Sequence, residues 1–146
     1  MKIIEIINEV FDSDVNGKII RATNDLFTTE AAIGNRRIVF NASMFEDNNG
    51  TEIWEIEFTE RVRGVMTYDK TGSGNEMQVF SFVIASIKEL ISRYKPAQIE
   101  FSSHKEDGNR SNLYRRMINK IKIPGYHSGE TLTDKYTDIF RIIRDK

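Results

Sequence analysis

The chain has 146 residues, of which 39% are hydrophobic and 29% charged, a composition typical of one globular domain with a substantial core. It contains no cysteine, which excludes disulfides, thiolate metal sites and a cysteine nucleophile. The net charge is −1, but residues 1–60 hold 12 acidic and 5 basic side chains, whereas residues 61–146 hold 10 acidic and 16 basic ones. This dipolar layout can orient an anionic ligand toward the C-terminal half. Two solvated faces that differ in charge explain it equally well.

Two apolar stretches bear on the location of the protein. Residues 1–7 are apolar but short, are interrupted by Glu5, and lack the small-residue cleavage site of a signal peptide. Residues 79–87 form the longest uncharged apolar run, which is too short to span a membrane. We therefore expect a cytoplasmic protein without a membrane partner. No repeat or linker divides the chain, so we expect a single domain over residues 1–146.

The first half of the chain predicts a helix followed by strands. Residues 3–11 have apolar side chains at helical spacing, which predicts a short helix that ends near Asp12. Strand-like runs at residues 27–33 and 37–45 precede the turn signals Gly34-Asn35 and Asn48-Asn49-Gly50, as in hairpins. Residues 52–60 form the clearest strand, because Trp54, Ile56 and Phe58 alternate with Glu55, Glu57 and Thr59. Residues 64–69 add another antiparallel strand.

From residue 76 the apolar period changes from that of a strand to that of a helix. The apolar side chains at 80, 83, 84, 87, 90, 91 and 94 predict a helix of about five turns with Asn75 as its N-cap. A strand at residues 98–103, a helix at 109–120 capped by Asn109 and a strand at 136–143 follow. The predicted fold class is therefore α+β, a mixed, mostly antiparallel sheet with helices packed on both faces.

A glycine turn joins the predicted strand at 64–69 to the long helix. Its residues are Thr71-Gly72-Ser73-Gly74-Asn75. Backbone N–H groups converge at such a turn without side chains in the way, so it can hold a pyrophosphate or another anion. The alternative interpretation is a flexible joint between strand and helix.

At this point the order of elements resembles the GNAT N-acetyltransferase superfamily, specifically the small divergent members that tailed phages encode. The matching segments are the glycine turn, Ile99-Glu100-Phe101-Ser102, Asn112-Leu113-Tyr114-Arg115-Arg116-Met117 and Pro124-Gly125-Tyr126. The resemblance covers roughly residues 60–145, which would form the acyl-CoA-binding half, while residues 1–60 form a divergent helix and β-meander. It implies acetyl-CoA as cofactor and an amine as acceptor.

The resemblance also implies roles for particular residues. Lys70, Thr71, Gly72, Ser73, Gly74 and Asn75 would bind the pyrophosphate, and Tyr114 would protonate the departing thiolate. The pantetheine would lie between the strands at 64–69 and 98–103. Asp69 stands where the family has Gln or Arg and would repel pyrophosphate, while Lys70 compensates. The pair of helices that builds the acceptor wall is missing, so the acceptor stays unidentified.

Candidates for the remaining roles come from the residues themselves. Glu57 on its polar strand face and His104 at a strand end are candidate general bases, although a solvated side chain explains either. A basic cluster comprises Lys105, Arg110, Arg115, Arg116, Lys120 and Lys122. Asn109 and Arg110 are candidate cofactor-binding residues, and the cluster could neutralise the 3′-phosphate of CoA, contact nucleic-acid phosphates or simply form a solvated face. The two histidines, His104 and His127, match no metal cage, so no metal site is expected.

Two functions therefore stay open. The first is an acyltransferase that moves an acetyl group from acetyl-CoA to an amine by direct attack. The second is a non-catalytic protein with the same fold that binds a protein or nucleic-acid partner through the basic helix at residues 105–122. The alternating strand at residues 52–60 could also form the surface of a homodimer.

Overall fold

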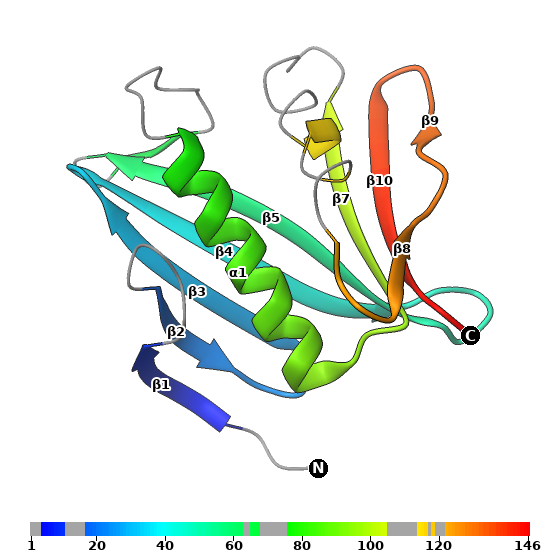
Figure 1. Cartoon of the computed structure of the whole chain (residues 1–146), viewed down its shortest axis with the longest axis horizontal. Helices are drawn as coiled ribbons and strands as arrows, with labels where there is room; N and C mark the ends of the chain where they lie inside the picture. The colour runs from blue at the N-terminus through cyan, green and yellow to red at the C-terminus, as the bar shows by residue number, and fades with distance from the viewer. Residues whose placement is uncertain are drawn as a thin grey trace.

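The computed structural model describes residues 4–10, 17–62, 65–67, 76–104, 114–116, 118 and 122–146. Its strands form one sheet, and the long helix α1 (Glu76–Tyr94) packs against it (Figure 1). Residues 114–116 and 118 are also helical. The strands are β1 (Ile4–Val10), β2 (Lys18–Ala22), β3 (Leu26–Ile33), β4 (Arg36–Glu46), β5 (Glu52–Val62), β6 (Val65–Thr67), β7 (Gln98–His104), β8 (Tyr126–Ser128), β9 (Leu132–Thr133) and β10 (Thr137–Arg144).

The sheet is mixed but mostly antiparallel, which confirms the predicted fold class. Its strand order is β1-β2-β3-β4-β5-β7-β10-β8, with β6 paired to β5 and β9 paired to β10. Among the described strands, β5 and β7 form the one parallel pair, and every other pair is antiparallel. The parallel pair follows from the connection, because α1 carries the chain back along the sheet between β5–β6 and β7.

The core lies on one face of the sheet, which we call the inner face. A row of side chains in register crosses five strands there, namely Phe27, Ala42, Ile56, Phe101 and Phe140. All five are buried, with at most 1% of each exposed. From α1, the buried residues Phe82, Val83, Ile87 and Leu90 recur at helical spacing and complete the core.

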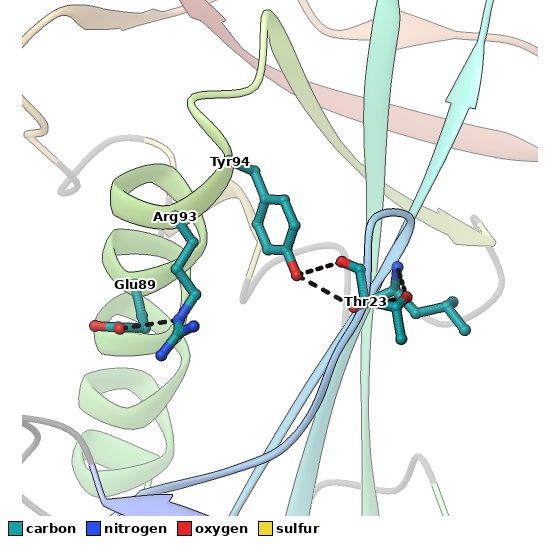
Figure 2. Close-up of polar contacts among 5 residues, drawn as sticks. Thr23, Glu89, Arg93 and Tyr94 are labelled. Carbon is teal, nitrogen blue, oxygen red and sulfur yellow. Dashed lines mark hydrogen bonds and ion pairs between the residues drawn. The ribbon is translucent and has the colours of Figure 1, made fainter. Parts of the chain in front are cut away.

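Two contacts fix α1 on this face. The ring centroids of Trp54 and Tyr94 lie 4.3 Å apart. The Tyr94 hydroxyl donates hydrogen bonds to the backbone oxygens of Thr23 at 2.6 Å and Leu26 at 3.4 Å (Figure 2). Burial raises the pKa of Tyr94 despite the nearby Arg93, so its hydroxyl stays a donor. The C-terminal end of α1 is thus tied to the turn between β2 and β3.

A buried polar contact joins the middle of α1 to β3. The Thr29 and Ser86 hydroxyls lie 2.8 Å apart, and both side chains are fully buried. Each hydroxyl satisfies the other in a place that water does not reach. The helical residues near 114 also meet the inner face, because the Tyr114 ring contacts Phe58, which shares that face of β5 with Trp54. The described helical residues therefore cover one face, whereas the sequence predicts helices on both.

Most predicted elements are confirmed. The structure has the hairpin turns at Gly34 and Gly50, both with positive φ (64° and 78°), the alternating strand β5, the five-turn helix α1 and the strands β7 and β10. The prediction of the last helix is met at residues 114–116 and 118, and the rest of that helix lies outside the described residues. Within the described chain, no helix is both long and apolar enough to cross a membrane.

The predicted N-terminal helix is wrong, because residues 4–10 form strand β1, which pairs antiparallel with β2. Three of its apolar residues, Ile4, Ile6 and Ile7, are β-branched and favour a strand, and a short apolar run does not distinguish the two periods. The short strands β2, β8 and β9 were not predicted. Only residues 11–17 join β1 to β2, too few for the missing pair of helices.

Candidate functional site

The sheet divides at its parallel pair. The ladder between β5 and β7 runs from Ile53–Gln98 to Ile56–Phe101 and ends there. Beyond this point the two strands diverge (Figure 1), while β7 stays paired to β10 as far as His104 and Thr137. We call this divergence, between β5 beyond Ile56 and β7 beyond Phe101, the strand fork.

The strand fork corrects one expectation about which strands flank the site. The predicted pair was residues 64–69 with residues 98–103. In the structure β6 (Val65–Thr67) folds back on β5 as an antiparallel hairpin, with Val62 opposite Val65, and β5 itself is the parallel neighbour of β7. The short connection between β5 and β6 explains this, because two residues allow only an antiparallel return. Residues 68 and 69 lie outside the described residues.

Tyr114 lies on the inner face at the base of the strand fork, where it contacts Phe58 on the β5 arm and Phe101 at the end of the ladder. Its ring centroid is 5.6 Å from that of Phe58 on β5, 5.4 Å from that of Phe101 on β7 and 6.0 Å from that of Phe140 on β10. The Tyr114 side chain is fully buried. Rings at these separations, mostly edge to face, pack favourably. Of the two predicted catalytic side chains that the structure describes, Tyr114 lies on the inner face where the sheet divides, and Glu57 does not.

Neighbouring contacts hold the helical residues against the sheet. The Arg115 guanidinium lies 3.9 Å from the Asp138 carboxylate and 5.6 Å from the centroid of the Phe140 ring. On the other side, the Ser128 hydroxyl donates a hydrogen bond of 3.2 Å to the backbone oxygen of Ile118. Asp138 is itself held by the Thr133 hydroxyl at 3.0 Å. The helical residues around Tyr114 are thus held by contacts to β8 and β10.

The first turn of α1 also lies at the fork end of the sheet. Tyr94 at the end of α1 contacts Trp54 near the start of β5, so the helix runs antiparallel to β5 and its first turn lies toward the other end of that strand (Figure 1). A helix N-terminus carries partial positive charge and free N–H groups. The fork end therefore combines the C-terminal ends of two parallel strands with a helix N-terminus.

Of the two predicted general bases, Glu57 lies on the face of the sheet opposite to Tyr114. Glu57 is exposed and lies opposite Asn41 in the ladder with β4. Since side chains alternate along a strand, Glu57 points to the outer face, away from the inner face that carries Phe58 and Tyr114. His104 is the last residue of β7 and lies opposite Thr137. The backbone of His104 therefore lies on the β7 arm of the fork.

The remaining predicted site residues fall outside the described part of the chain. These are Asp69, Lys70, Thr71, Gly72, Ser73, Gly74 and Asn75 of the loop, and Asn109 and Arg110. From the basic cluster, Arg115, Arg116 and Lys122 are exposed, and Lys105 and Lys120 are likewise not described. Gly125 has a φ of 86°, and the Tyr126 hydroxyl after it donates to the backbone oxygen of Pro96 at 2.6 Å. Burial raises the pKa of Tyr126, against the effect of Arg144.

The outer face is polar and brings two carboxylates together. Glu55 and Glu100 lie opposite each other in the ladder between β5 and β7. Partial burial, and to a smaller extent the charges of Glu55 and Asp47, raise the pKa of Glu100, while a 2.7 Å hydrogen bond from Gln98 and the charge of Arg141 lower it. No three histidine or acidic side chains of the described residues are arranged to hold a metal ion.

A shallow hollow of about 310 Å³ also lies at the outer face, away from the fork. It is lined by Ile20, Arg21, Leu26, Thr28 and Asn41. The register shift in β2 between Ile19 and Arg21 marks a bulge, which gives this end of the sheet its irregular surface. The Thr28 hydroxyl donates to the Asn41 side-chain oxygen at 2.6 Å, so one wall of the hollow is internally hydrogen-bonded.

Among known proteins, similarity to this chain is found with solved structures. No protein-family model and no curated protein matches the chain. Among solved structures, a GNAT-family acetyltransferase from Streptococcus pneumoniae aligns with a TM-score of 0.47 and 11% identity over 83% of this chain and 66% of that one. A chimeric form of a spermidine N-acetyltransferase from Vibrio cholerae aligns with a TM-score of 0.40 and 12% identity, over 75% and 64% of the two chains. The chain thus spans about two thirds of the length of these acetyltransferases.

Sequence reasoning missed the residues that surround Tyr114. The alternation in β5 and β7 predicts that Phe58 and Phe101 are buried, but not that both meet one ring from another element. The contact between Arg115 and Asp138 joins residues far apart in the chain, and no local pattern marks it. Only the strand order, with β10 beside β7, brings these residues together.

Proposed function

We propose that the protein is a GNAT-like acyltransferase, of the small kind that tailed phages encode, and that it transfers an acetyl group from acetyl-CoA to an amine. The observation that carries the proposal is the strand fork with Tyr114 in it. The β7-facing edge of β5 is paired with β7 as far as Ile56 and with β6 from Glu60 onward, which leaves residues 57–59 of that edge for a ligand. Ligands of open sheets containing parallel strands bind at the carboxyl ends of those strands. The N-terminus of α1 at the same end suits an anionic group.

The sequence directly before α1 offers residues for such a cofactor. Lys70, Thr71, Gly72, Ser73, Gly74 and Asn75 precede α1 directly and would hold the pyrophosphate, with Asn109 and Arg110 on the 3′-phosphate. The pantetheine would lie along β5 and β7 beyond Ile56 and Phe101. When bound, acetyl-CoA would supply the acetyl group as a thioester. Tyr114 lies in the same fork, so its position suits a role at the reacting end.

The proton transfers would fall to residues of this chain. The Tyr114 hydroxyl would donate a proton to the departing thiolate, in surroundings from which its three aromatic neighbours exclude water. His104 or Glu57 would accept a proton from the amine. Glu57 lies on β5 just beyond Ile56 and His104 ends β7, so both stay candidates for this role.

The binding step can be tested by nuclear magnetic resonance. We expect acetyl-CoA to shift the backbone amide signals of residues 57–59 on β5, of residues 102–104 on β7 and of the first turn of α1. Amides at the outer-face hollow, such as those of Arg21 and Thr28, serve as the internal control and should not move. Shifts confined to the control region, or none at millimolar acetyl-CoA, would contradict the proposal.

The chemical step has its own test. Tyr114→Phe removes the hydroxyl but keeps the ring, so we expect turnover with an amine panel to fall by about 10²–10⁴-fold, the usual contribution of a general acid. Binding of acetyl-CoA should be unchanged. Equal turnover by the variant and the parent would exclude Tyr114 as the acid.

The second candidate function, a non-catalytic binding protein, rests on the exposed Arg115 and Arg116. If the basic cluster binds nucleic acid, affinity for a short duplex should fall steeply with salt and be lost in the Arg115→Ala/Arg116→Ala double variant. The ion pair of Arg115 with Asp138 means that the variant must first be shown to be folded. Binding that is insensitive to salt and to the double substitution would exclude this function.

A further inference from the structure

We propose that Asp138 on β10 is a positioning residue for Tyr114. One of its carboxylate oxygens holds β9, and the other holds the helical residues that carry Tyr114. The inference rests on the proposed function in one respect, because it takes the Tyr114 hydroxyl as the group that must be placed for the transfer.

The first argument is that Asp138 is a buried carboxylate. Only 7% of Asp138 is exposed, and it is the one carboxylate that is buried among the residues whose burial the structure describes. A charged group that is taken out of water is unfavourable unless other groups compensate it. A buried carboxylate at the edge of the candidate site therefore indicates specific partners that it holds in place.

The second argument is where β10 places this carboxylate. Since side chains alternate along a strand, Asp138 lies on the inner face with Phe140, two residues nearer the fork end. The ring centroid of Phe140 lies 6.0 Å from that of Tyr114. Asp138 also lies opposite Ser103 on β7, beyond the point at Phe101 where the ladder between β5 and β7 ends. The carboxylate is therefore on the same face as Tyr114 and at the open end of the sheet.

The third argument is that each carboxylate oxygen has a partner on a different element. The Asp138 Oδ1 atom accepts a hydrogen bond of 3.0 Å from the Thr133 hydroxyl on β9. The Oδ2 atom lies 3.9 Å from Nη2 of Arg115, the residue directly after Tyr114. The Arg115 guanidinium also lies 5.6 Å from the centroid of the Phe140 ring. Because Arg115 shares a helical turn with Tyr114, an anchor on Arg115 limits the rotation of this turn and the placement of the Tyr114 side chain.

Fluorine nuclear magnetic resonance of the full-length protein labelled with 3-fluorotyrosine follows Tyr114 directly. The chain has five tyrosines, and Tyr114→Phe identifies the Tyr114 signal by its loss. Three aromatic rings surround this side chain. Since ring currents depend on distance and orientation, the chemical shift of the Tyr114 signal reports small movements of the side chain.

We expect Asp138→Asn to shift or broaden the Tyr114 signal, because an amide of the same shape cannot form the ion pair with Arg115. Arg115→Gln should have the same effect, and the double variant should show little more, since both substitutions remove one contact. Asp145→Asn is the matched control. It removes a carboxylate just beyond the other end of β10, where Asp145 pairs with His127 at 2.5 Å, and it should leave the Tyr114 signal in place.

Turnover of acetyl-CoA with an amine panel gives a second readout. We expect Asp138→Asn to lower kcat by roughly 10- to 100-fold, the effect of a misplaced reacting group, and to leave KM for acetyl-CoA unchanged. A purely structural role would not separate kcat from KM in a protein that is folded. Unchanged kcat in a variant whose Tyr114 signal has moved would overturn the proposal.

The proposal is also overturned if the folded Asp138→Asn and Arg115→Gln proteins keep the parent's Tyr114 signal, or if Asp145→Asn moves it as much. The Arg115 side chain is 54% exposed, so Arg115→Gln decides the question if Asp138→Asn does not fold. If the parent neither binds nor turns over acetyl-CoA, the proposed function fails, while the fluorine signal still decides whether Asp138 positions Tyr114.

Discussion

Three tyrosines stabilise the structure through different parts of their side chains. Tyr94 and Tyr126 use their hydroxyls to hold backbone oxygens of Thr23 and Pro96, which ties elements together. The ring of Tyr114 contacts three other aromatic rings. Of these three tyrosines, Tyr114 is the one that lies at the strand fork. Its ring and its hydroxyl can therefore be tested separately by Phe and Ala substitutions.

Glu100 gives a prediction for the dependence of stability on pH. Its pKa is raised above the ordinary value of 4.5, chiefly by burial, so the folded protein binds its proton more tightly than the unfolded chain does. The contribution of Glu100 to the free energy of unfolding is fully present below about pH 4.5, and it is lost as the pH rises through the pKa of Glu100 in the folded protein. Glu100→Gln should therefore be more stable than the parent at pH 7, with the difference shrinking toward pH 4.

Urea unfolding of both proteins at pH 4 and pH 7 measures this difference. Glu57→Gln on the same face is the matched control, because Asn41 rather than a carboxylate lies opposite it. A Glu100→Gln protein that is less stable than the parent at pH 7, or a difference that does not change with pH, would contradict the account.

Whole elements depend on a few contacts between helix and sheet. Thr29 on β3 and Ser86 on α1 form a fully buried hydroxyl pair at 2.8 Å. Thr29→Val leaves the Ser86 hydroxyl without this partner and should lower the free energy of unfolding by about 1–3 kcal/mol. Adding Ser86→Ala removes the second polar group, so the double variant should recover part of that loss. Strictly additive losses in the double-mutant cycle would show that the pair is not coupled.

The end of α1 offers a second test. Lys95 has a φ of 47°, in the left-handed region that favours glycine, and its N–H donates to the backbone oxygen of Ile91 at 2.9 Å. Lys95→Gly should raise the free energy of unfolding by roughly 0.5 kcal/mol. The same substitution at the exposed Lys88 inside α1 should lower it by roughly 0.5–1 kcal/mol. Thermal unfolding of both variants measures these changes. A Lys95→Gly protein that is less stable than the parent would contradict the assignment of a left-handed conformation to Lys95.

The elements could largely be predicted because their patterns are local. The alternation around Trp54 and the helical period from Phe80 to Tyr94 each determine one element, and both are confirmed. The N-terminal strand was mistaken for a helix because a short run of isoleucines fits both periods. The antiparallel strand at residues 65–67 was predicted, but its place was misjudged, because β5 and not β6 is the parallel neighbour of β7.

The candidate site could be predicted less well than the fold. Tyr114 was identified from its motif, and the structure places it at the fork, but its role as an acid stays a prediction. That Phe58, Phe101 and Phe140 surround it follows from contacts between segments distant in the chain. Glu57 was singled out from the polar face of its strand, and that same alternation directs it away from Tyr114.

At the scale of the whole molecule, the sheet is built of two parts that meet along one short parallel ladder. β1 to β5 form an antiparallel run, β7, β10 and β8 form another, and four register pairs between β5 and β7 join them. Because the joint is confined to residues 53–56 and 98–101, the two parts can diverge at one end while staying joined at the other. This architecture places the proposed cofactor site at the open end, beside the start of α1 (Figure 1).

Calorimetric titration with CoA and acetyl-CoA tests the central claim most directly, with Gly74→Glu as the variant that adds a carboxylate to the loop before α1. The account predicts micromolar binding to the parent and loss of binding in the variant, because a negative side chain there repels the pyrophosphate. No heat from the folded parent at millimolar ligand, or equal binding by parent and variant, would contradict it.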